Sequence, residues 1–166
     1  MNFNPADHRM VPQQRWFEDF ELGESFVLPS RTMTSGIFAA FQVASGDNHP
    51  VHYDREFCRR HGHAEMLAHG FQVVIQTCAG AGLFPHMVED SLKGFIEQSS
   101  RFLAPVLLGD TVYPRLTVDE LSPNRTTGVL GLRSTVHNQH GVLVMEGRHR
   151  YLLRKREATA ATLPTA

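Results

Sequence analysis

The sequence predicts an α+β domain in which a curved antiparallel sheet wraps around one long buried helix. At 166 residues the chain is long enough for a single domain with a sizeable core. Residues 67–84 are mostly apolar, carry almost no charge and end at Pro85, so we expect a central helix that is buried on all sides. Four strand-like segments follow it, and a buried helix followed by consecutive strands is typical of the α+β class.

Before the central helix, the chain is expected to form one strand and two short helices. Residues 24–33 alternate loosely in hydrophobicity, which predicts a strand, and Thr34-Ser35-Gly36 is typical of a helix start. Pro50 lacks a backbone donor and disfavours a helical conformation at His49, so residues 47–51 should form an irregular loop. Asp54 is suited to cap a second short helix over residues 54–60.

The four later segments are predicted to be strands of a meandering antiparallel sheet. They cover residues 92–103, 111–121, 128–138 and 142–153, and turn signals such as Gly109-Asp110 and His140-Gly141 separate them. Residues 1–14 are polar with two prolines, and residues 157–166 lack periodicity and bulky core residues, so both ends are expected to be flexible. A single domain over residues 15–156 is therefore expected.

Charge and composition argue against several classes of function. The net charge of −1 gives no general attraction to nucleic acid or to an anionic membrane, and no segment approaches the roughly 18 apolar residues of a membrane span. Cys58 and Cys78 lack C-x-x-C spacing, which favours free thiols in a reducing compartment. The first residues show no signal-peptide pattern. We expect a cytoplasmic protein whose partners are small molecules or copies of itself.

The segment from Ala44 to Asp54 carries the strongest functional signal. It places a carboxylate and an imidazole, Asp47 and His52, five residues apart on a backbone that cannot stay helical. Such a pair can hold and polarise one water, the minimal equipment for adding water to a polarised double bond or removing it. An enzyme is the leading hypothesis, and the alternative is that Asp47 caps a turn while His52 is a structural histidine.

This segment resembles the S-G-D-x-N-P-x-H pattern of the MaoC-like dehydratases and (R)-specific enoyl-CoA hydratases. Further blocks occur in family order and extend the resemblance over residues 17–153, among them Arg31-Thr32-Met33-Thr34, Ala68-His69-Gly70, Arg101-Phe102-Leu103-Ala104-Pro105-Val106 and Asn138-Gln139-His140-Gly141. The resemblance implies a hotdog fold, in which the sheet wraps a long helix, and pairing into homodimers. Dimerisation is also physically reasonable, because joining edge strands removes exposed hydrogen-bonding edges.

The same resemblance implies roles for individual residues. Asp47 and His52 correspond to the catalytic pair, and Gly70 to the glycine whose backbone N–H is the oxyanion donor. N–H groups near a helix start lack intrahelical partners, and glycine lets a carbonyl approach closely; a simple packing role for Gly70 is the alternative. The implied reaction interconverts a 2-enoyl thioester, most simply enoyl-CoA, and a 3-hydroxyacyl thioester, without a metal or redox cofactor.

Residues around this motif give weaker signals. His49 stands where the family has asparagine and Asn48 is displaced by one position, so we expect both to lie behind the catalytic pair and to position water. Arg59 and Arg60 are candidates for CoA phosphates, although an ordinary solvated helix face is favoured. Two candidates for lining an acyl tunnel flank the glycine region, with core packing as the safer account: Met66 and Phe71.

Three alternatives remain open from the sequence. The histidine spacings His49-x-x-His52 and His61-x-His63 are weak evidence for zinc without a cysteine pair or a helical H-E-x-x-H, so no metal site is expected. A thioesterase is the alternative enzyme, because hotdog proteins also hydrolyse acyl-CoA. A noncatalytic acyl-CoA-binding or assembly module is the alternative from another class.

Overall fold

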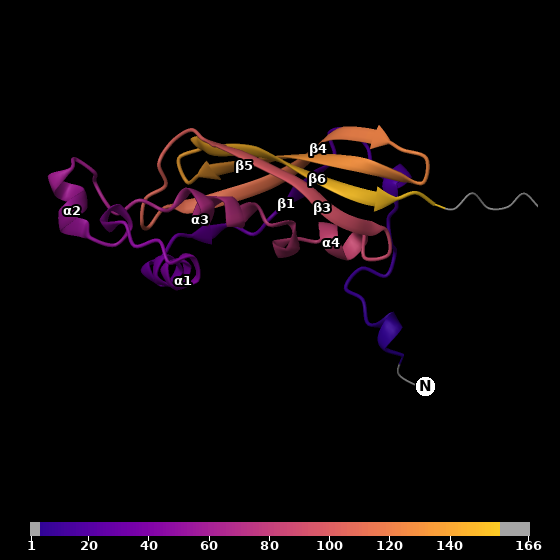
Figure 1. Ribbon diagram of the computed structural model, residues 1–166, viewed down its shortest axis with the longest axis horizontal. Coiled ribbons are helices and arrows are strands. Elements are labelled where there is room, and N and C mark those ends of the chain that lie inside the picture. Colours follow the sequence, from indigo (N-terminus) through magenta and orange to yellow (C-terminus); the bar gives the residue numbers. More distant parts are fainter. Residues whose placement is uncertain (1–3, 157–166) are drawn as a thin grey trace, which may run out of the picture.

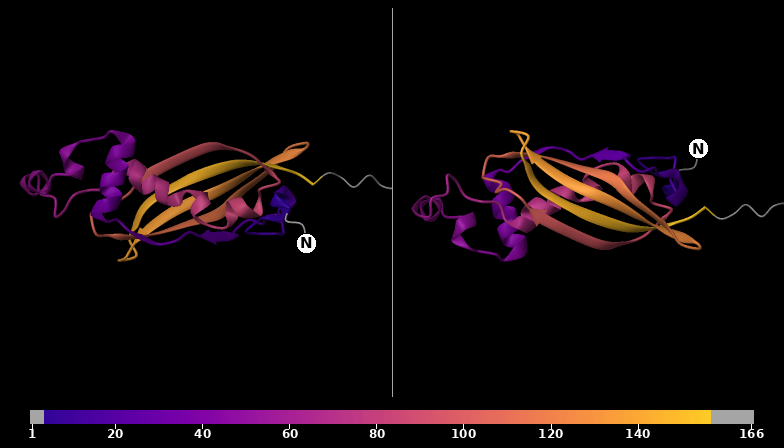
Figure 2. Two further views of the ribbon diagram at one scale, coloured as in Figure 1. Left: turned by 90° about the horizontal axis from the view of Figure 1, so that it is seen from below. Right: turned by 90° about the horizontal axis from the view of Figure 1, so that it is seen from above.

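The computed structural model describes residues 4–156, which form one antiparallel sheet with helical segments across one of its faces (Figures 1 and 2). The helical segments are η1 (Pro5–Asp7), η2 (Phe17–Asp19), α1 (Ser35–Ser45), η3 (Pro50–His52), α2 (Arg55–Arg60), α3 (Gly70–Val74), η4 (Ile75–Thr77), η5 (Ala79–Ala81) and α4 (Phe84–Met87). The strands are β1 (Ser25–Val27), β2 (Arg31–Thr32), β3 (Leu92–Phe102), β4 (Thr111–Pro123), β5 (Thr127–Asn138) and β6 (Leu143–Arg154).

The sheet has the strand order β1-β4-β5-β6-β3, and β2 also pairs with β4. Two hairpins join β4 to β5 and β5 to β6. Strand β3 precedes them in the chain and pairs with the other side of β6. The short strands β1 and β2 therefore form one edge of the sheet and the long strand β3 forms the other. The predicted α+β class and the four later strands are confirmed.

The early strand is shorter than expected because a proline interrupts it. The predicted segment 24–33 forms two separate pieces, β1 and β2, on either side of Pro29. Proline lacks the N–H that a continuous ladder would need. The two short helices begin as predicted: the Thr34 side chain accepts from the N–H of Ile37 at 3.4 Å, and Asp54 accepts from that of Phe57 at 2.9 Å.

The expected long central helix is wrong in detail, since residues 67–84 form a chain of short helical turns. Leu67 instead makes a β-bridge to Leu107, and α3 begins only at Gly70. Cys78 leaves the helical region with a ψ of 118°, and glycines with low helix propensity follow it. The segment is also not buried on all sides, because three large apolar side chains are exposed: Phe71, Ile75 and Leu83.

The core consists of two apolar clusters on the helix-covered face. One contains Phe20, Phe26, Phe84, Leu130 and Leu153 among others, and lies toward the end of the sheet near α4. The other lies beneath α1 and α3 and includes the following: Met33, Phe38, Val73, Val112, Val136 and Met145. Between the two clusters lies a belt of buried polar side chains, which we call the polar belt: Gln72, Gln76, Thr77, Ser134 and His149.

Burial favours the neutral form of His149 within the polar belt. Thr77 donates its only proton to the carbonyl of Val74 at 2.7 Å, so its oxygen accepts from His149 Nε2–H at 3.2 Å. His149 Nδ1 then faces the hydroxyl of Tyr151 at 3.5 Å. Burial lowers the pKa of His149, and burial together with Cys78 raises the pKa of Tyr151 to about 12.

This burial predicts a loss of stability on acidification. Because the folded-state pKa of His149 lies below its ordinary value of 6.5, the unfolded chain takes up the proton first. The free energy of unfolding should therefore fall as pH drops below 6.5 and level off below the folded pKa. Denaturant unfolding at several pH values measures this, and His149→Gln should flatten the profile. The exposed His140, changed to Gln, is the control; equal profiles for both variants would contradict the assignment.

The start of the described chain contacts the domain before the expected boundary at residue 15. Arg9 forms an ion pair with Asp90 at 2.6 Å, and Gln14 donates to the carbonyl of His86 at 2.8 Å. The predicted flexible end at 157–166 lies outside the described residues. No helix within residues 4–156 is long and apolar enough to cross a membrane.

Candidate active site

The segment that carries Asp47 begins at the end of α1, where a glycine turns the chain. Gly46 adopts a left-handed conformation with φ of 69°, and its N–H closes the helix on the carbonyl of Gln42 at 2.9 Å. A side chain would be disfavoured at this φ, so the glycine suits the helix end. Asp47 follows directly after this glycine. The end of α1 lies at the same end of the sheet as α2 (Figure 1).

Asp47 is held by the backbone of its own loop. Its Oδ1 accepts the backbone N–H of His49 at 3.2 Å, while the side chain remains about half exposed, at 54%. The extended conformation of His49 before Pro50 then directs the chain into the 3-10 turn η3, which ends at His52. Residues 47–49 are irregular as the sequence predicted, but the helix has already ended at Gly46, and Pro50 instead begins the turn that carries His52.

His52 has a defined tautomer because its ring nitrogen meets a carbonyl. Nδ1 lies 2.6 Å from the carbonyl oxygen of Leu67, which can only accept, so Nδ1 carries the proton. Nε2 of the neutral ring is therefore an acceptor. Burial is the main cause that lowers the pKa of His52 and His69 adds to it, while the bond to Leu67 and the charge of Asp47 oppose it. The ring is thus suited to accept a proton near neutral pH.

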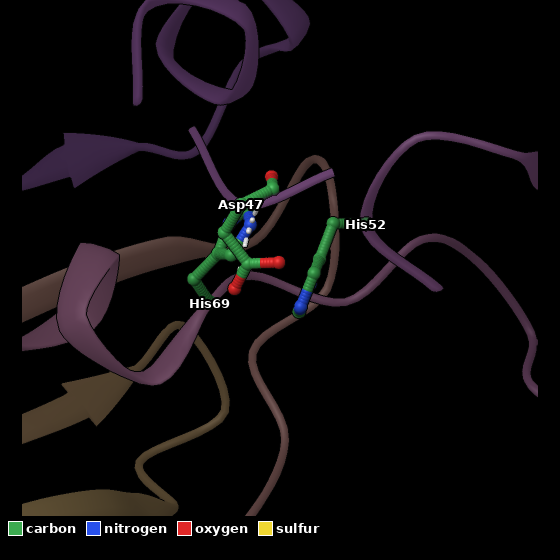
Figure 3. A group of neighbouring side chains, drawn as sticks. All are labelled: Asp47, His52 and His69. Atoms are coloured by element: carbon green, nitrogen blue, oxygen red, sulfur yellow. Dashed lines mark hydrogen bonds and ion pairs between the residues drawn. The ribbon is translucent and has the colours of Figure 1, made fainter. Parts of the chain in front are cut away.

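A second histidine joins the pair and was not assigned a role from the sequence. His69 precedes α3 and is buried; its Nε2 lies 3.7 Å from Asp47 Oδ2 and 3.1 Å from the hydroxyl of Tyr53. Its ring stacks on that of His52 with centroids 3.6 Å apart. Figure 3 shows the three side chains gathered from the loop after α1 and the turn before α3. Its place directly before Gly70 was the available sequence signal.

The three side chains offer a donor set that a divalent metal could use. One ligand atom from each of Asp47, His52 and His69 lies within 4.8 Å of the others. However, a metal requires imidazole lone pairs that converge on one point, and the lone pairs lie in the ring planes. The two rings are stacked with centroids 3.6 Å apart and planes only 22° from parallel, so their in-plane lone pairs do not meet at a single point close to both rings. The arrangement suits a hydrogen-bonded water better than a metal.

Gly70 is the first residue of α3, so its N–H has no acceptor within the helix. Among the described residues no other hydrogen bond uses this N–H. The glycine also makes a close contact, because a Cβ at this position would lie 2.7 Å from Cζ of Phe102 on β3. Gly70 is thus required for packing against Phe102, and its N–H remains available beside His69.

The other residues singled out from the sequence have different surroundings. Asn48 turns toward α1, where its side chain bonds Gln42 and the carbonyl of Gly46. His49 Nδ1 accepts from the N–H of Val51 at 3.3 Å, so its imidazole caps η3 while its own N–H orients Asp47. The roles of both in positioning water stay predictions.

The candidates for binding the rest of a substrate are not gathered at Asp47. Arg59 pairs with Glu56 inside α2, and Arg60 is exposed on the same helix. Met66 packs against the apolar cluster beneath α1 and α3, whereas Phe71 is 74% exposed. A separate groove with a volume of about 1290 Å³ runs along β1, β4 and β5, and its lining includes none of the three side chains in Figure 3.

A comparison of this sequence with known protein families finds one that matches most of the chain. Residues 19–138 match the family described as the MaoC like domain. The chain belongs to the MaoC-like family. The match covers the loop with Asp47 and His52, the turn before α3 and strands β3 to β5. The resemblance inferred from the sequence motifs is therefore confirmed.

Individual MaoC-like relatives are distant. The 3-hydroxybutyryl-CoA dehydratase of Methylorubrum extorquens is 29% identical over 154 residues, which is 89% of this chain and 91% of that protein. Protein MaoC of Klebsiella aerogenes is 31% identical over 112 residues, covering 67% of this chain but only 32% of that protein. This chain therefore spans about a third of the second relative.

The shape of this MaoC-like chain recurs in solved structures. A conserved protein from Mycobacterium tuberculosis with a double hotdog fold superposes with a TM-score of 0.68 and 26% identity, over 92% of this chain and 47% of that one. The predicted hotdog fold is confirmed. Here the sheet wraps a broken series of helical turns rather than one continuous helix.

Proposed function

We propose that this MaoC-like protein is a hydratase or dehydratase that interconverts a 2-enoyl thioester, most simply enoyl-CoA, and a 3-hydroxyacyl thioester. The observation that carries the proposal is the approach of the Asp47 carboxylate to two imidazoles, one of which has a free Nε2 acceptor. This arrangement can bind one water and accept its proton. The 3-hydroxybutyryl-CoA dehydratase among the relatives supports the thioester as the substrate class.

In the hydration direction, His52 is the base. Its Nε2 takes one proton from the water as the oxygen forms a bond to the β carbon, and Asp47 orients that water. The electron pair of the double bond moves toward the thioester carbonyl, and the proton on His52 Nε2 then passes to the α carbon. Dehydration follows the same steps in reverse. Asp47 also stabilises the protonated imidazole, since opposite charges at this separation favour the charged form.

Gly70 supplies the oxyanion donor in this proposal. Its uncommitted N–H can donate to the thioester oxygen as negative charge develops there, and a preorganised donor of this kind is commonly worth about 3 kcal/mol. His69 is a positioning residue, because it contacts Asp47 and stacks on His52. It limits the movement of both groups.

Turnover of enoyl-CoA substrates tests the proposal directly. Purified protein should consume crotonyl-CoA, followed as loss of the absorbance of the conjugated thioester, and form 3-hydroxybutyryl-CoA. A thiol reagent added in parallel detects free CoA, which a thioesterase would release. Release of CoA without hydration would assign a thioesterase, and binding of acyl-CoA without either reaction would assign a noncatalytic module.

The lowered pKa of His52 predicts the pH dependence of hydration. Only the neutral ring can act as the base, so kcat/KM should fall on acidification with a midpoint below the ordinary histidine value of 6.5. The pH profile of crotonyl-CoA hydration measures this midpoint. The His140→Gln variant is the control, because the exposed His140 is not among the groups that shift the pKa of His52 and its loss should leave the midpoint in place. An acidic limb centred above 6.5 would argue against His52 as the base.

We also propose that the chain works as a homodimer. Large apolar side chains remain exposed along β3 and α3, including Phe71, Phe95 and Phe102. Exposed apolar patches of this kind mark interaction sites. Sedimentation velocity of the purified protein at micromolar concentration tests this proposal, and a monomer would contradict it.

A further inference from the structure

The groove along β1, β4 and β5 is lined by charged side chains of only one sign. Its volume of about 1290 Å³ exceeds the roughly 300–1,000 Å³ of typical ligand pockets. Among the described residues, its lining contains two arginines and two histidines but no aspartate or glutamate. The whole chain, by contrast, has 17 acidic residues against 16 lysines and arginines. A cleft lined by one sign of charge attracts ions of the opposite sign, so the groove favours an anionic ligand.

The two arginines, Arg115 and Arg133, are diagonal neighbours on the sheet face opposite the helices. The strand register places Arg115 opposite Thr135, and Thr117 opposite Arg133. Leu116, between the β4 residues, is buried in the core on the helix side, so its neighbours in the strand point the other way. All four polar residues line the groove. Two positive charges on diagonal positions repel each other unless an anion lies between them.

No carboxylate of the chain neutralises these two arginines. Each of the four carboxylates on β3 to β6 forms an ion pair with another arginine, at distances between 2.9 and 3.4 Å: Glu97 and Glu120 with Arg150, Asp119 with Arg148, and Glu146 with Arg101. Within residues 4–156 the side chains of Arg115 and Arg133 form no ion pair or hydrogen bond. Their guanidinium groups are therefore available to an external anion.

An aromatic ring and an aliphatic side chain lie beside these arginines in the groove. Tyr113 precedes Arg115 by two residues on β4, so it lies on the same face about 7 Å further along the strand. Val27 on β1 is directly opposite Arg115. Tyr113 is 48% exposed and Val27 is 69% exposed, and both line the groove. Exposed tyrosine rings stack well on flat heterocycles, so this part of the groove suits the base of a nucleotide.

We propose that the groove binds a nucleotide at a site separate from the candidate active site. Arg115 and Arg133 bind its phosphoryl groups, because guanidinium groups form strong paired hydrogen bonds to phosphoryl oxygens. The hydroxyl of Thr135 between them donates a further hydrogen bond. The base lies on the ring of Tyr113 and against Val27. A nucleotide thus satisfies both the unpaired charges and the exposed apolar surface of the same groove.

The groove shares no residue with the cluster of Asp47, His52 and His69. A nucleotide bound there leaves the catalytic side chains free to act on a thioester. The inference therefore goes beyond the proposed hydratase function and does not rest on it.

Calorimetric titration of the purified protein with ADP tests the site. We expect one ADP to bind per chain, and adenosine and inorganic pyrophosphate each to bind at least about tenfold more weakly, because each lacks one half of the contacts. Arg115→Gln and Arg133→Gln should each weaken ADP binding at least about tenfold, the usual effect of removing a hydrogen bond to a charged group. Tyr113→Leu should weaken the binding of ADP but not that of pyrophosphate.

Arg125→Gln is the matched control, because it removes an exposed arginine that does not line the groove. It should bind ADP as tightly as the natural protein does, and circular dichroism checks that every variant is folded. Absence of ADP binding, or equal ADP affinity of Arg115→Gln, Arg133→Gln and the natural protein, would overturn the site. Pyrophosphate that binds as tightly as ADP would overturn the nucleotide as its ligand.

The kinetics of crotonyl-CoA hydration test whether the groove is separate from the substrate site. We expect the KM for crotonyl-CoA to be the same in Arg115→Gln and in the natural protein. A rise in KM that matches the loss of ADP affinity would mean that the groove holds the nucleotide part of the substrate, and would overturn the separate site. If the natural protein has no hydratase activity, the proposed function fails, while the ADP titration still decides whether the groove binds a nucleotide.

Discussion

Changing Asp47 to asparagine is expected to lower kcat for crotonyl-CoA hydration by about 10²- to 10⁴-fold, the usual contribution of a positioned acid-base group. Asparagine keeps the shape and can still accept the N–H of His49 that orients the side chain. It loses the negative charge that stabilises the protonated His52. Steady-state kinetics with crotonyl-CoA measures the change, and thermal unfolding checks that the fold is retained.

Asp54→Asn is the matched control for this change. Asp54 lies on the same segment and caps α2 through the N–H of Phe57, and asparagine caps a helix about as well as aspartate. We expect turnover and stability of Asp54→Asn to stay near those of the natural protein. A loss of activity in Asp47→Asn no larger than that of the control would remove Asp47 from the reaction.

Changing Gly70 to alanine is expected to lower hydration by about 10²-fold, which corresponds to the loss of an oxyanion contact. The added methyl would lie 2.7 Å from the Phe102 ring and would keep a thioester carbonyl away from the N–H. Because Phe102 is 54% exposed, its ring can turn aside, so we expect a smaller effect on stability than on turnover. Kinetics and thermal unfolding of the same preparation separate the two effects.

Two comparisons distinguish an oxyanion donor from a packing glycine. Gly80→Ala is the matched control, since nothing lies within 4 Å of a Cβ at that position, and it should be active. In the double variant Gly70→Ala with Phe102→Ala the clash is removed but the methyl remains. We expect this double variant to stay impaired. Recovery of its activity would mean that Gly70 serves only to accommodate Phe102.

The strands of the sheet could be predicted from the sequence because their side chains alternate. In β4, every second residue from Val112 to Val118 is buried, while Tyr113, Arg115 and Thr117 between them are exposed or half-buried, and this alternation is visible in the sequence. The central helix was overestimated for a related reason: hydrophobicity shows what packs against the sheet but not whether the backbone is continuous. The break at Cys78 depends on backbone geometry, which composition does not reveal.

Part of the candidate site could also be predicted. Asp47 and His52 are close in sequence, and the turn η3, which begins at Pro50, brings them together. His69 was missed because its approach to Asp47 depends on how α3 packs beneath α1, a contact between distant segments. The contact of Phe102 with Gly70 likewise joins residues of different elements. The spacing of residues along the chain thus identified the loop with Asp47 and His52. The contacts of His69 and Phe102 depend on tertiary packing and could not be predicted.

The polar belt that divides the core has a consequence for the motions of the protein. The cluster beneath α1 and α3 shares few apolar contacts with the cluster near α4, because buried polar side chains lie between them. Cooperative units in proteins usually follow such divisions. Native-state amide hydrogen exchange should therefore show α1 and α3 opening together at lower free energy than β4 and β5. The loop that carries Asp47 and His52 would then open more often than the opposite end of the sheet, which remains protected.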